Sequence, residues 1–288
     1  MILTNSSAAK VGGNNATAIA SATASFRQLM CYLSTTISTA LTGTRGLIKN
    51  GVGQLTLSGT CNYTGPTQIN AGTLAVTGAS TLNGVISGSG SLTKTGTAVL
   101  TIGGNNTYSG GTSFVSGGLS GLILFTSSNA FGTGLFTLSN AAGRIDTGGN
   151  VTLSNNFQLN TSLQYRTIGA NTITVTGNIA GTGNVSKTGN GTIVLSGTLT
   201  YTGQTIITTG LLRAFKTTGA STATATFNSA GTFIAVSFNV SPPSGVTTFR
   251  FFQGSTANTW GVGTLTGVPT GTTATYNSAT STLSVTVP

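Results

Sequence analysis

The sequence predicts an all-β fold, a right-handed parallel β-helix (solenoid) in which short strands stack coil upon coil. Three observations predict it. A Gly- and Thr-rich block recurs three times, its strands alternate apolar and hydroxyl residues, and charged residues make up only 4% of the chain. Alternation puts the apolar residues on one face of each strand, and a recurring unit buries that face by stacking on its neighbours. We prefer this fold to a β-sandwich or barrel because hairpin signals are sparse and the repeat is longer than a hairpin.

The recurring block is anchored by three lysines that begin copies 45 and 93 residues apart. In each copy a glycine follows the lysine after two residues and another after ten, and a tyrosine follows after fourteen. We expect these positions to be structural rather than to line a binding face. They include Lys49, Lys94, Lys187, Tyr63, Tyr108, Tyr201, Gly72, Gly117 and Gly210.

The length of one coil follows from the strands, such as "QLTLSG" and "TIVLSG", which are short and end at Gly, Asn or Ser turns. Three strands of about 5 residues with short turns give a coil of roughly 20–25 residues. The 45-residue interval between the first two copies is therefore expected to span two coils.

The segments "LTKTGTAVLTIGGNNTYSGGTSFVSGGL" and "VSKTGNGTIVLSGTLTYTGQTIITTGLL" resemble the autotransporter-associated β-strand repeat of bacterial passenger domains. The resemblance covers about residues 41–215. It implies a right-handed β-helix in a large secreted or surface-displayed protein with an adhesive or structural role. The sequence departs from that pattern in two ways, since we expect neither a secretory signal at its start nor a membrane barrel after residue 215.

Residues 16–41 break the strand pattern, because apolar residues recur there at a spacing of three or four and Gly43 follows. This spacing predicts an amphipathic helix. We favour a lid over the first coil, since an open ladder end is an aggregation template. A helical bundle between copies and docking into a larger particle remain open. The expected contact residues are Ile19, Phe26, Leu29, Leu33 and Ile37.

Pro242-Pro243 predicts a boundary, because proline cannot continue a central strand. The expected organisation is an N-terminal arm and helix over 1–41, β-helix repeats over 42–241, and a strand-rich C-terminal cap over 242–288. No membrane span is expected, because no stretch approaches about 18 uninterrupted apolar residues. Two cysteines do not make a disulfide scaffold, so Cys31 and Cys61 are interpreted as semi-buried thiols.

The net charge of +10 arises from eleven scattered lysines and arginines against one acid, Asp146. A dedicated nucleic-acid binder clusters its cations and interleaves aromatics, so we do not expect that function. Contact with carbohydrate or with an anionic surface remains open. A surface of Thr, Ser and Asn with few charges favours close packing of copies, and we expect a homo-oligomer.

Most catalytic chemistry lacks its residues, since the chain has no His and no Glu, and Asp146 is its only acid. Paired carboxylates, a Ser-His-Asp triad and ordinary metal sites are therefore not available. Ser186-Lys187 falls on the repeat lysine position and is interpreted as structural. We expect no enzyme activity, no cofactor and no metal site.

The sequence thus predicts a non-enzymatic structural or adhesive protein. Our first hypothesis is an exterior component of a bacteriophage virion (a head decoration, fibre or tail appendage) that contacts other virion proteins. The alternative is a bacterial cell-surface adhesin or extracellular filament subunit of autotransporter-passenger type, which contacts other surface proteins.

Overall fold

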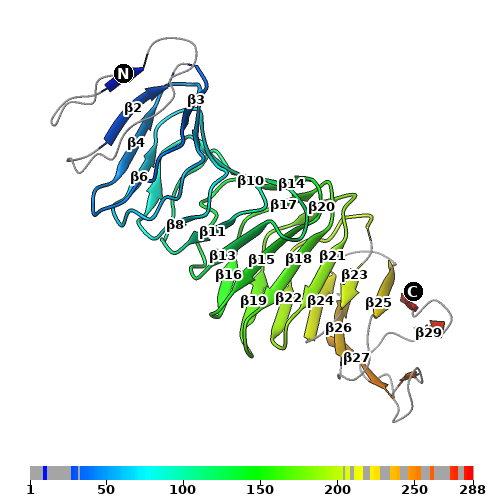
Figure 1. Cartoon of the computed structure of the whole chain (residues 1–288). Coiled ribbons are helices and arrows are strands. Elements are labelled where there is room, and N and C mark those ends of the chain that lie inside the picture. Colours follow the sequence, from blue (N-terminus) through cyan, green and yellow to red (C-terminus); the bar gives the residue numbers. More distant parts are fainter. Residues whose placement is uncertain are drawn as a thin grey trace. The chain divides into compact units, whose positions relative to one another are not determined.

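The computed structural model describes the backbone over residues 9–11, 27–31, 33–203 and a series of later strands that begins at residue 205. Side chains are described for residue 31 and for 33–203, except 116. The described residues form strands and turns, with no helix among them (Figure 1). The chain divides into two compact units, Met1–Ile145 with Ser154–Gln158, and Asp146–Leu153 with Leu159–Pro288.

The first unit contains the strands β1 to β14. They are β1 (Ala9–Val11), β2 (Arg27–Cys31), β3 (Thr35–Ile37), β4 (Leu47–Asn50), β5 (Gln54–Leu57), β6 (Thr67–Ile69), β7 (Thr73–Val76), β8 (Ser80–Leu82), β9 (Ile86–Ser87), β10 (Ser91–Gly96), β11 (Val99–Ile102), β12 (Thr112–Ser116), β13 (Leu122–Phe125) and β14 (Phe136–Asn140). Two strands hold the points of division between the units, β15 (Gly143–Thr147) and β17 (Phe157–Leu159).

The second unit contains the remaining described strands. They are β16 (Val151–Leu153), β18 (Leu163–Thr167), β19 (Thr172–Val175), β20 (Ile179–Gly181), β21 (Val185–Thr188), β22 (Thr192–Leu195), β23 (Thr205–Ile207), β24 (Leu211–Lys216), β25 (Ser221–Phe227), β26 (Ile234–Val240), β27 (Val246–Gln253), β28 (Trp260–Val262), β29 (Thr273–Asn277) and β30 (Thr282–Val287).

Successive coils of the first unit stack their strands in parallel on three sheets (Figure 1). One sheet has the order β1-β2-β4-β6-β9, the second contains β14-β12-β10-β7-β5-β3, and the third contains β13-β11-β8. One coil therefore contributes three strands, for example β6, β7 and β8. Leu74 pairs with Leu92, 18 residues later, and Phe114 pairs with Leu138, 24 residues later. The predicted parallel solenoid is confirmed, with coils close to the predicted length. Its handedness stays a prediction.

The interior of the first unit is filled by every second residue of each strand, as the alternation predicts. In β11, for example, Leu100 and Ile102 are buried and Thr101 is half-buried. Phenylalanines add to this core, because Phe136 lies 4.8 Å from Phe131 and 4.9 Å from Phe157 between ring centroids. Aromatic contacts of this kind add to the stabilisation that comes from burial.

The second unit has the same parallel stacking and then changes direction of pairing. β16, β19, β22, β24 and β26 are parallel neighbours, and so are β18, β21, β23 and β25. β27 pairs antiparallel with β26, and β30 pairs antiparallel with β25. The strand-rich C-terminal segment is thus confirmed. Because β27 and β30 occupy edges that a further coil would otherwise use, they end the parallel ladders.

The helix predicted over 16–41 is wrong over its described part. Leu29 lies in β2 and Ile37 lies in β3, and both strands pair in parallel with the next coil. In β3, Thr35 and Ile37 are buried while Thr36 is exposed, which is strand alternation. The β-branched run "STTIST" favours strands, and ladder hydrogen bonds to the next coil outweigh a helical periodicity. Ile19 and Phe26 lie outside the described residues.

Candidate functional site

The three repeat lysines are buried inside the solenoid. Lys49 in β4, Lys94 in β10 and Lys187 in β21 each have 0% of their surface exposed. A buried charge is costly unless its donors are satisfied. Each lysine must therefore find acceptors within the chain.

Lys49 finds three backbone acceptors, at the end of its own strand, in the turn that follows and in the next coil. Its Nζ donates hydrogen bonds to the carbonyl oxygens of Gly51 at 2.7 Å, Ala71 at 2.9 Å and Asn50 at 3.3 Å. An ammonium group has three protons to donate. The Lys49 side chain thus holds its own turn and joins it to the following coil.

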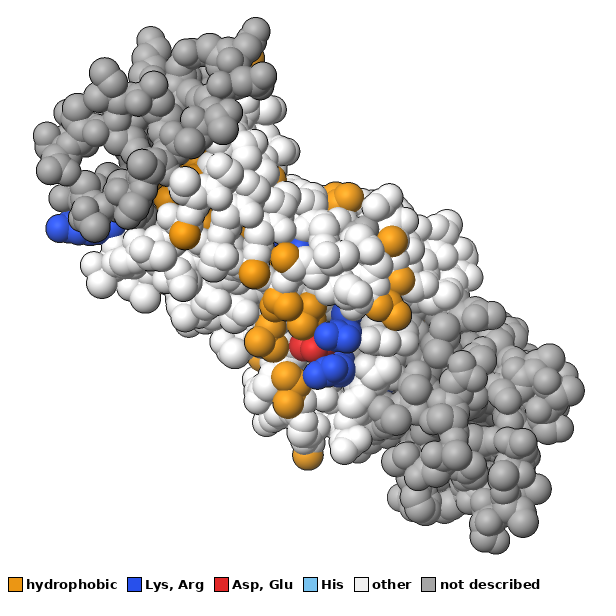
Figure 2. Space-filling view, viewed as in Figure 1, with side chains coloured by type: hydrophobic (Ala, Val, Ile, Leu, Met, Phe, Trp, Pro, Cys, Tyr) orange, Lys and Arg blue, Asp and Glu red, His pale blue; other side chains and the backbone are white. Residues whose placement is uncertain are grey.

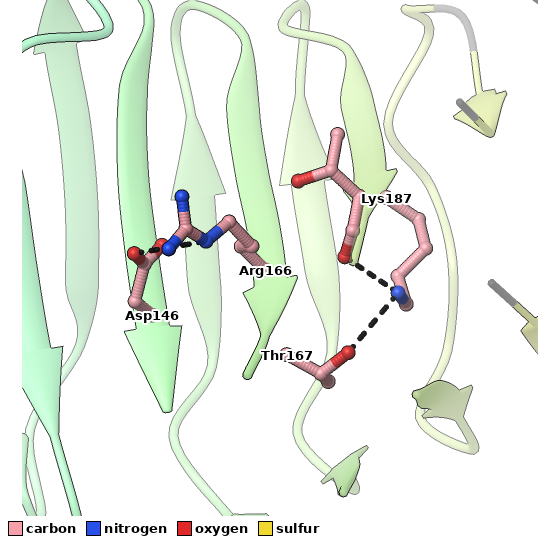
Figure 3. Close-up of polar contacts among 5 residues, drawn as sticks. Asp146, Arg166, Thr167 and Lys187 are labelled. Carbon is pink, nitrogen blue, oxygen red and sulfur yellow. Dashed lines mark hydrogen bonds and ion pairs between the residues drawn. The ribbon is translucent and has the colours of Figure 1, made fainter. Parts of the chain in front are cut away.

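The other two lysines repeat the first half of this pattern. Lys94 Nζ donates to Thr95 O and, at 3.1 Å, to Gly96 O. Lys187 Nζ donates at 2.6 Å to both Thr188 O and Gly189 O. It also donates at 3.3 Å to Thr167 Oγ1 of the preceding coil (Figure 3). Among the residues that the structure describes, Lys94 bonds only its two local carbonyls, so it has the fewest acceptors of the three.

The glycine two residues after each lysine has a positive φ, +80° at Gly51, +70° at Gly96 and +79° at Gly189. Residues with a Cβ atom rarely adopt this left-handed conformation. The conformation turns the chain so that two successive carbonyls face the ammonium group. The Lys-x-Gly motif of the repeat therefore forms one local structure, in which a buried lysine bonds the carbonyl oxygens of the next two residues and the second of these is a left-handed glycine. We call it the lysine-clamped turn.

Burial changes the ionisation of these lysines. It lowers the pKa of Lys94 and the pKa of Lys187 to about 8. It also lowers the pKa of Lys49, where the thiol of Cys31 acts in the opposite direction. Because about 8 is above neutral pH, Lys94 and Lys187 keep the third proton at pH 7 and donate as ammonium groups.

The repeat tyrosines are paired with a threonine four residues later. Tyr63 Oη lies 2.7 Å from Thr67 Oγ1, and Tyr108 Oη lies 2.6 Å from Thr112 Oγ1, and all four residues are buried. Burial raises the pKa of Tyr108, while the hydrogen bond to Thr112 opposes that rise. Tyr201, in the third copy, is half-buried. Tyr63 and Tyr108 are thus interior polar groups with partners rather than parts of a binding surface.

Several repeat glycines lie where coils touch. A Cβ atom on Gly59 would lie 2.5 Å from Thr39 O, and one on Gly197 would lie 2.1 Å from Gly177 O. Gly72 has a φ of +66° and would meet Gly53 O at 2.5 Å. Gly117 is exposed and Gly210 lies outside the described residues. Gly59, Gly72 and Gly197 thus allow the backbone of one coil to lie against the next.

The first two copies of the repeat are not separated by a whole number of coils, which corrects the predicted spacing of two coils. Lys49 lies on the sheet β1-β2-β4-β6-β9, whereas Lys94 lies on the neighbouring sheet that contains β7, β10 and β12. Between Lys49 and Lys94 the chain passes through two full coils and one further strand. The reason is that each coil here has fewer residues than half of the 45-residue interval between the two lysines. Equivalent residues of these two copies therefore lie on different sheets and cannot form one binding face.

The single acid of the chain forms an ion pair. Asp146 Oδ2 lies 3.2 Å from Arg166 Nε, and the Asp146 side chain is 2% exposed while that of Arg166 is 41% exposed (Figure 3). Cys31 and Cys61 form no disulfide, as interpreted from the sequence, but both are fully buried rather than semi-buried. Within the part of the chain that the structure describes, no three His, Cys, Asp or Glu residues gather as metal ligands. No helix of that part is long and apolar enough to span a membrane.

Two buried asparagines also join coils, and sequence reasoning missed them. Asn106 accepts a hydrogen bond from Ile86 N at 2.7 Å and donates one to Ala130 O at 2.7 Å. Asn155 donates to Gly134 O at 2.8 Å. Neither carries a sequence signal, because an interior asparagine and a turn asparagine look alike in a chain rich in Asn.

Of the predicted docking residues, Leu33 and Ile37 have described side chains, and these two differ in exposure. Leu33 is 56% exposed, whereas Ile37 is 1% exposed and belongs to the core. Leu33 lies in the bend before β3, whereas Ile37 lies in β3 on the same buried side as Thr35.

The fold and the repeat positions define a class of protein, a repeat protein whose consensus residues hold the coils of a parallel β-solenoid. Three segments, residues 47–76, 92–120 and 185–214, match the family model of the passenger-associated-transport-repeat. The chain carries three repeats of this autotransporter-passenger type, as the resemblance in its sequence predicted. No curated protein and no solved structure matches the chain.

Proposed function

We propose that this protein is a non-enzymatic structural scaffold with an adhesive role, displayed on an exterior surface. The observation that supports this proposal most is that the repeat lysines and the first two repeat tyrosines are buried and hydrogen-bonded within the fold. What recurs along the chain therefore maintains the solenoid rather than a reactive centre. A β-solenoid with passenger-type repeats fits a structural or adhesin role, and such repeats suggest an extracellular or cell-surface location.

The outer surface supports a role in contact rather than in catalysis. Of the six lysines and arginines with described side chains, three are the buried repeat lysines, and Arg166 is paired with Asp146. The formal net charge thus overstates the charge that a partner would meet on this part of the chain. On the face drawn in Figure 2, the part that the structure describes is mostly neither hydrophobic nor charged. A surface of hydroxyls and amides favours close contact with neutral partners, because charge repulsion is small.

Two settings fit such a scaffold. The passenger-type repeats favour a bacterial cell-surface adhesin or extracellular filament subunit. The low surface charge also favours dense packing on a particle, which is the setting of an exterior bacteriophage protein. Self-association, carbohydrate and other structural proteins of the same surface are the partners we propose in either setting.

The deciding experiment is localisation by quantitative mass spectrometry in purified virions and in washed cell envelopes. Enrichment in envelopes supports the adhesin setting, and enrichment in virions supports the particle setting. Recovery in the cytoplasmic fraction alone would contradict an exterior role in both. Gene neighbours give an independent check, since secretion genes accompany the first setting and capsid genes the second.

A further inference from the structure

The chain contains three Asn-Gly pairs, Asn50-Gly51, Asn83-Gly84 and Asn190-Gly191. This dipeptide is chemically labile, because the backbone nitrogen of the second residue can attack the side-chain carboxamide of the first. Glycine allows the attack most readily, since no side chain crowds its nitrogen. Whether the reaction proceeds in a folded chain depends on what holds that N–H group and that carboxamide.

Asn83-Gly84 is the pair whose asparagine is exposed. Asn83 is exposed in the turn between β8 and β9. Among the described residues, no acceptor is bonded to the Gly84 N–H and no partner to the Asn83 carboxamide. Gly84 is needed for stacking, because a Cβ atom there would lie 2.1 Å from Gly65 O of the preceding coil. The stack thus requires the residue that makes Asn83 labile.

Asn190-Gly191 is the same dipeptide in a different environment. Gly191 is buried, and its N–H donates a hydrogen bond of 2.9 Å to Thr167 Oγ1. The nitrogen must give up this bond before it can attack. Asn50 is intermediate, because it is half-buried and its Oδ1 accepts a hydrogen bond of 2.7 Å from Asn70 Nδ2.

We propose that Asn83 is a site of spontaneous deamidation and that Thr167 protects Asn190 from the same reaction. The Gly84 nitrogen loses its proton to hydroxide and attacks Asn83 Cγ. The side-chain nitrogen leaves as ammonia, and a five-membered succinimide ring remains. One water molecule then opens the ring at either carbonyl and gives aspartate or isoaspartate. No oxidant, reductant or enzyme takes part.

The product changes the molecule in two ways. It gives the chain an exposed carboxylate, whereas its single native acid is buried. Isoaspartate also lengthens the backbone by one methylene group at a corner where Gly65, Gly84 and Gly104 of successive coils touch. Deamidation at Asn83 thus loosens the coil stack at this corner as the protein ages.

The test is to age the folded full-length protein at mildly alkaline pH and to follow each site by peptide mass spectrometry. After denaturation, trypsin releases residues 50–94, which hold Asn50 and Asn83, and residues 188–213, which hold Asn190. Fragmentation assigns the site, and methylation by isoaspartyl methyltransferase counts isoaspartate. We expect Asn83 to react roughly tenfold faster than Asn190, about the effect of one hydrogen bond. The two rates should converge in denaturant.

Equal rates in the folded protein, or a faster reaction at Asn190, would overturn the proposal. The variant Thr167→Val removes the acceptor of the Gly191 N–H, and its Asn190 should then react nearly as fast as Asn83. An unchanged Asn190 rate in a folded Thr167→Val protein would overturn the protective role. The comparison of folded with denatured wild-type protein does not depend on that variant. Asn83→Ser is the matched control and should abolish the faster signal in residues 50–94.

Discussion

Lys187 donates a hydrogen bond of 2.6 Å to the carbonyl oxygen of Gly189, the glycine two residues further along the chain. Lys49 and Gly51 have the same relationship at 2.7 Å, and Lys94 and Gly96 at 3.1 Å. In each case a left-handed glycine turns a carbonyl toward a buried ammonium group. A short sequence motif is thereby explained by one local structure, which makes the following effects predictable.

The first prediction ranks the lysines by their acceptors. Replacement of Lys49 by Met leaves three carbonyl acceptors without their donor, whereas Lys94→Met leaves two. An unsatisfied buried group costs about 1–3 kcal/mol, while removal of a buried charge recovers part of that cost. We expect Lys49→Met to lower the free energy of unfolding more than Lys94→Met. Urea unfolding measures both, with the exposed Arg45→Met as control. The reverse order would contradict the role of the acceptors.

The second prediction grades three glycine-to-alanine variants. Gly148 has open space around it and Gly96 has open space but a φ of +70°. Gly189 has a φ of +79°, and a Cβ atom there would lie 2.1 Å from Thr167 O. We expect almost no destabilisation for Gly148→Ala, about 1–2 kcal/mol for Gly96→Ala from the left-handed backbone, and a larger loss for Gly189→Ala. Equal effects at Gly96 and Gly189 in denaturant unfolding would show that coils do not touch there.

The third prediction concerns pH. The folded-state pKa of Lys187 is about 8 and its ordinary value is 10.5. Between these values the unfolded chain binds more protons than the folded chain, so the stability from this lysine rises with pH and is smallest below about pH 8. We expect wild-type protein to gain stability relative to Lys187→Met as pH increases from 7 to 10. Thermal unfolding of both proteins across this range gives the difference. A difference that is constant with pH would contradict a buried, titrating amine.

The fourth prediction concerns the tyrosine pairs. Tyr108 Oη and Thr112 Oγ1 lie 2.6 Å apart with no exposed surface at Tyr108. A double-mutant cycle with Tyr108→Phe and Thr112→Val isolates their coupling. We expect a coupling of about 1 kcal/mol, the usual contribution of one hydrogen bond. The same cycle with Tyr108→Phe and the half-buried Thr101→Val serves as control and should give none.

The sequence predicts the solenoid because each physical requirement of that fold depends on residues that are close together in the chain. Strand alternation separates core from surface, as in Leu100 and Ile102 of β11, and Lys-x-Gly recurs wherever a clamped turn occurs. The phase of the repeat could not be predicted, since coil length varies from 18 to 24 residues with turn length and only stacking reveals it. The predicted helix failed at Ile37 because an apolar spacing can satisfy two periodicities, and the neighbouring coil decides between them.

The central claim is that the repeat lysines are interior clamps and not a binding face. Brief labelling of the native protein with an amine-reactive ester, read by mass spectrometry after denaturation, tests it most directly. We predict that Lys49, Lys94 and Lys187 stay unmodified in the native protein and react readily in denaturant. Rapid modification of these three amines in the native protein would contradict the account.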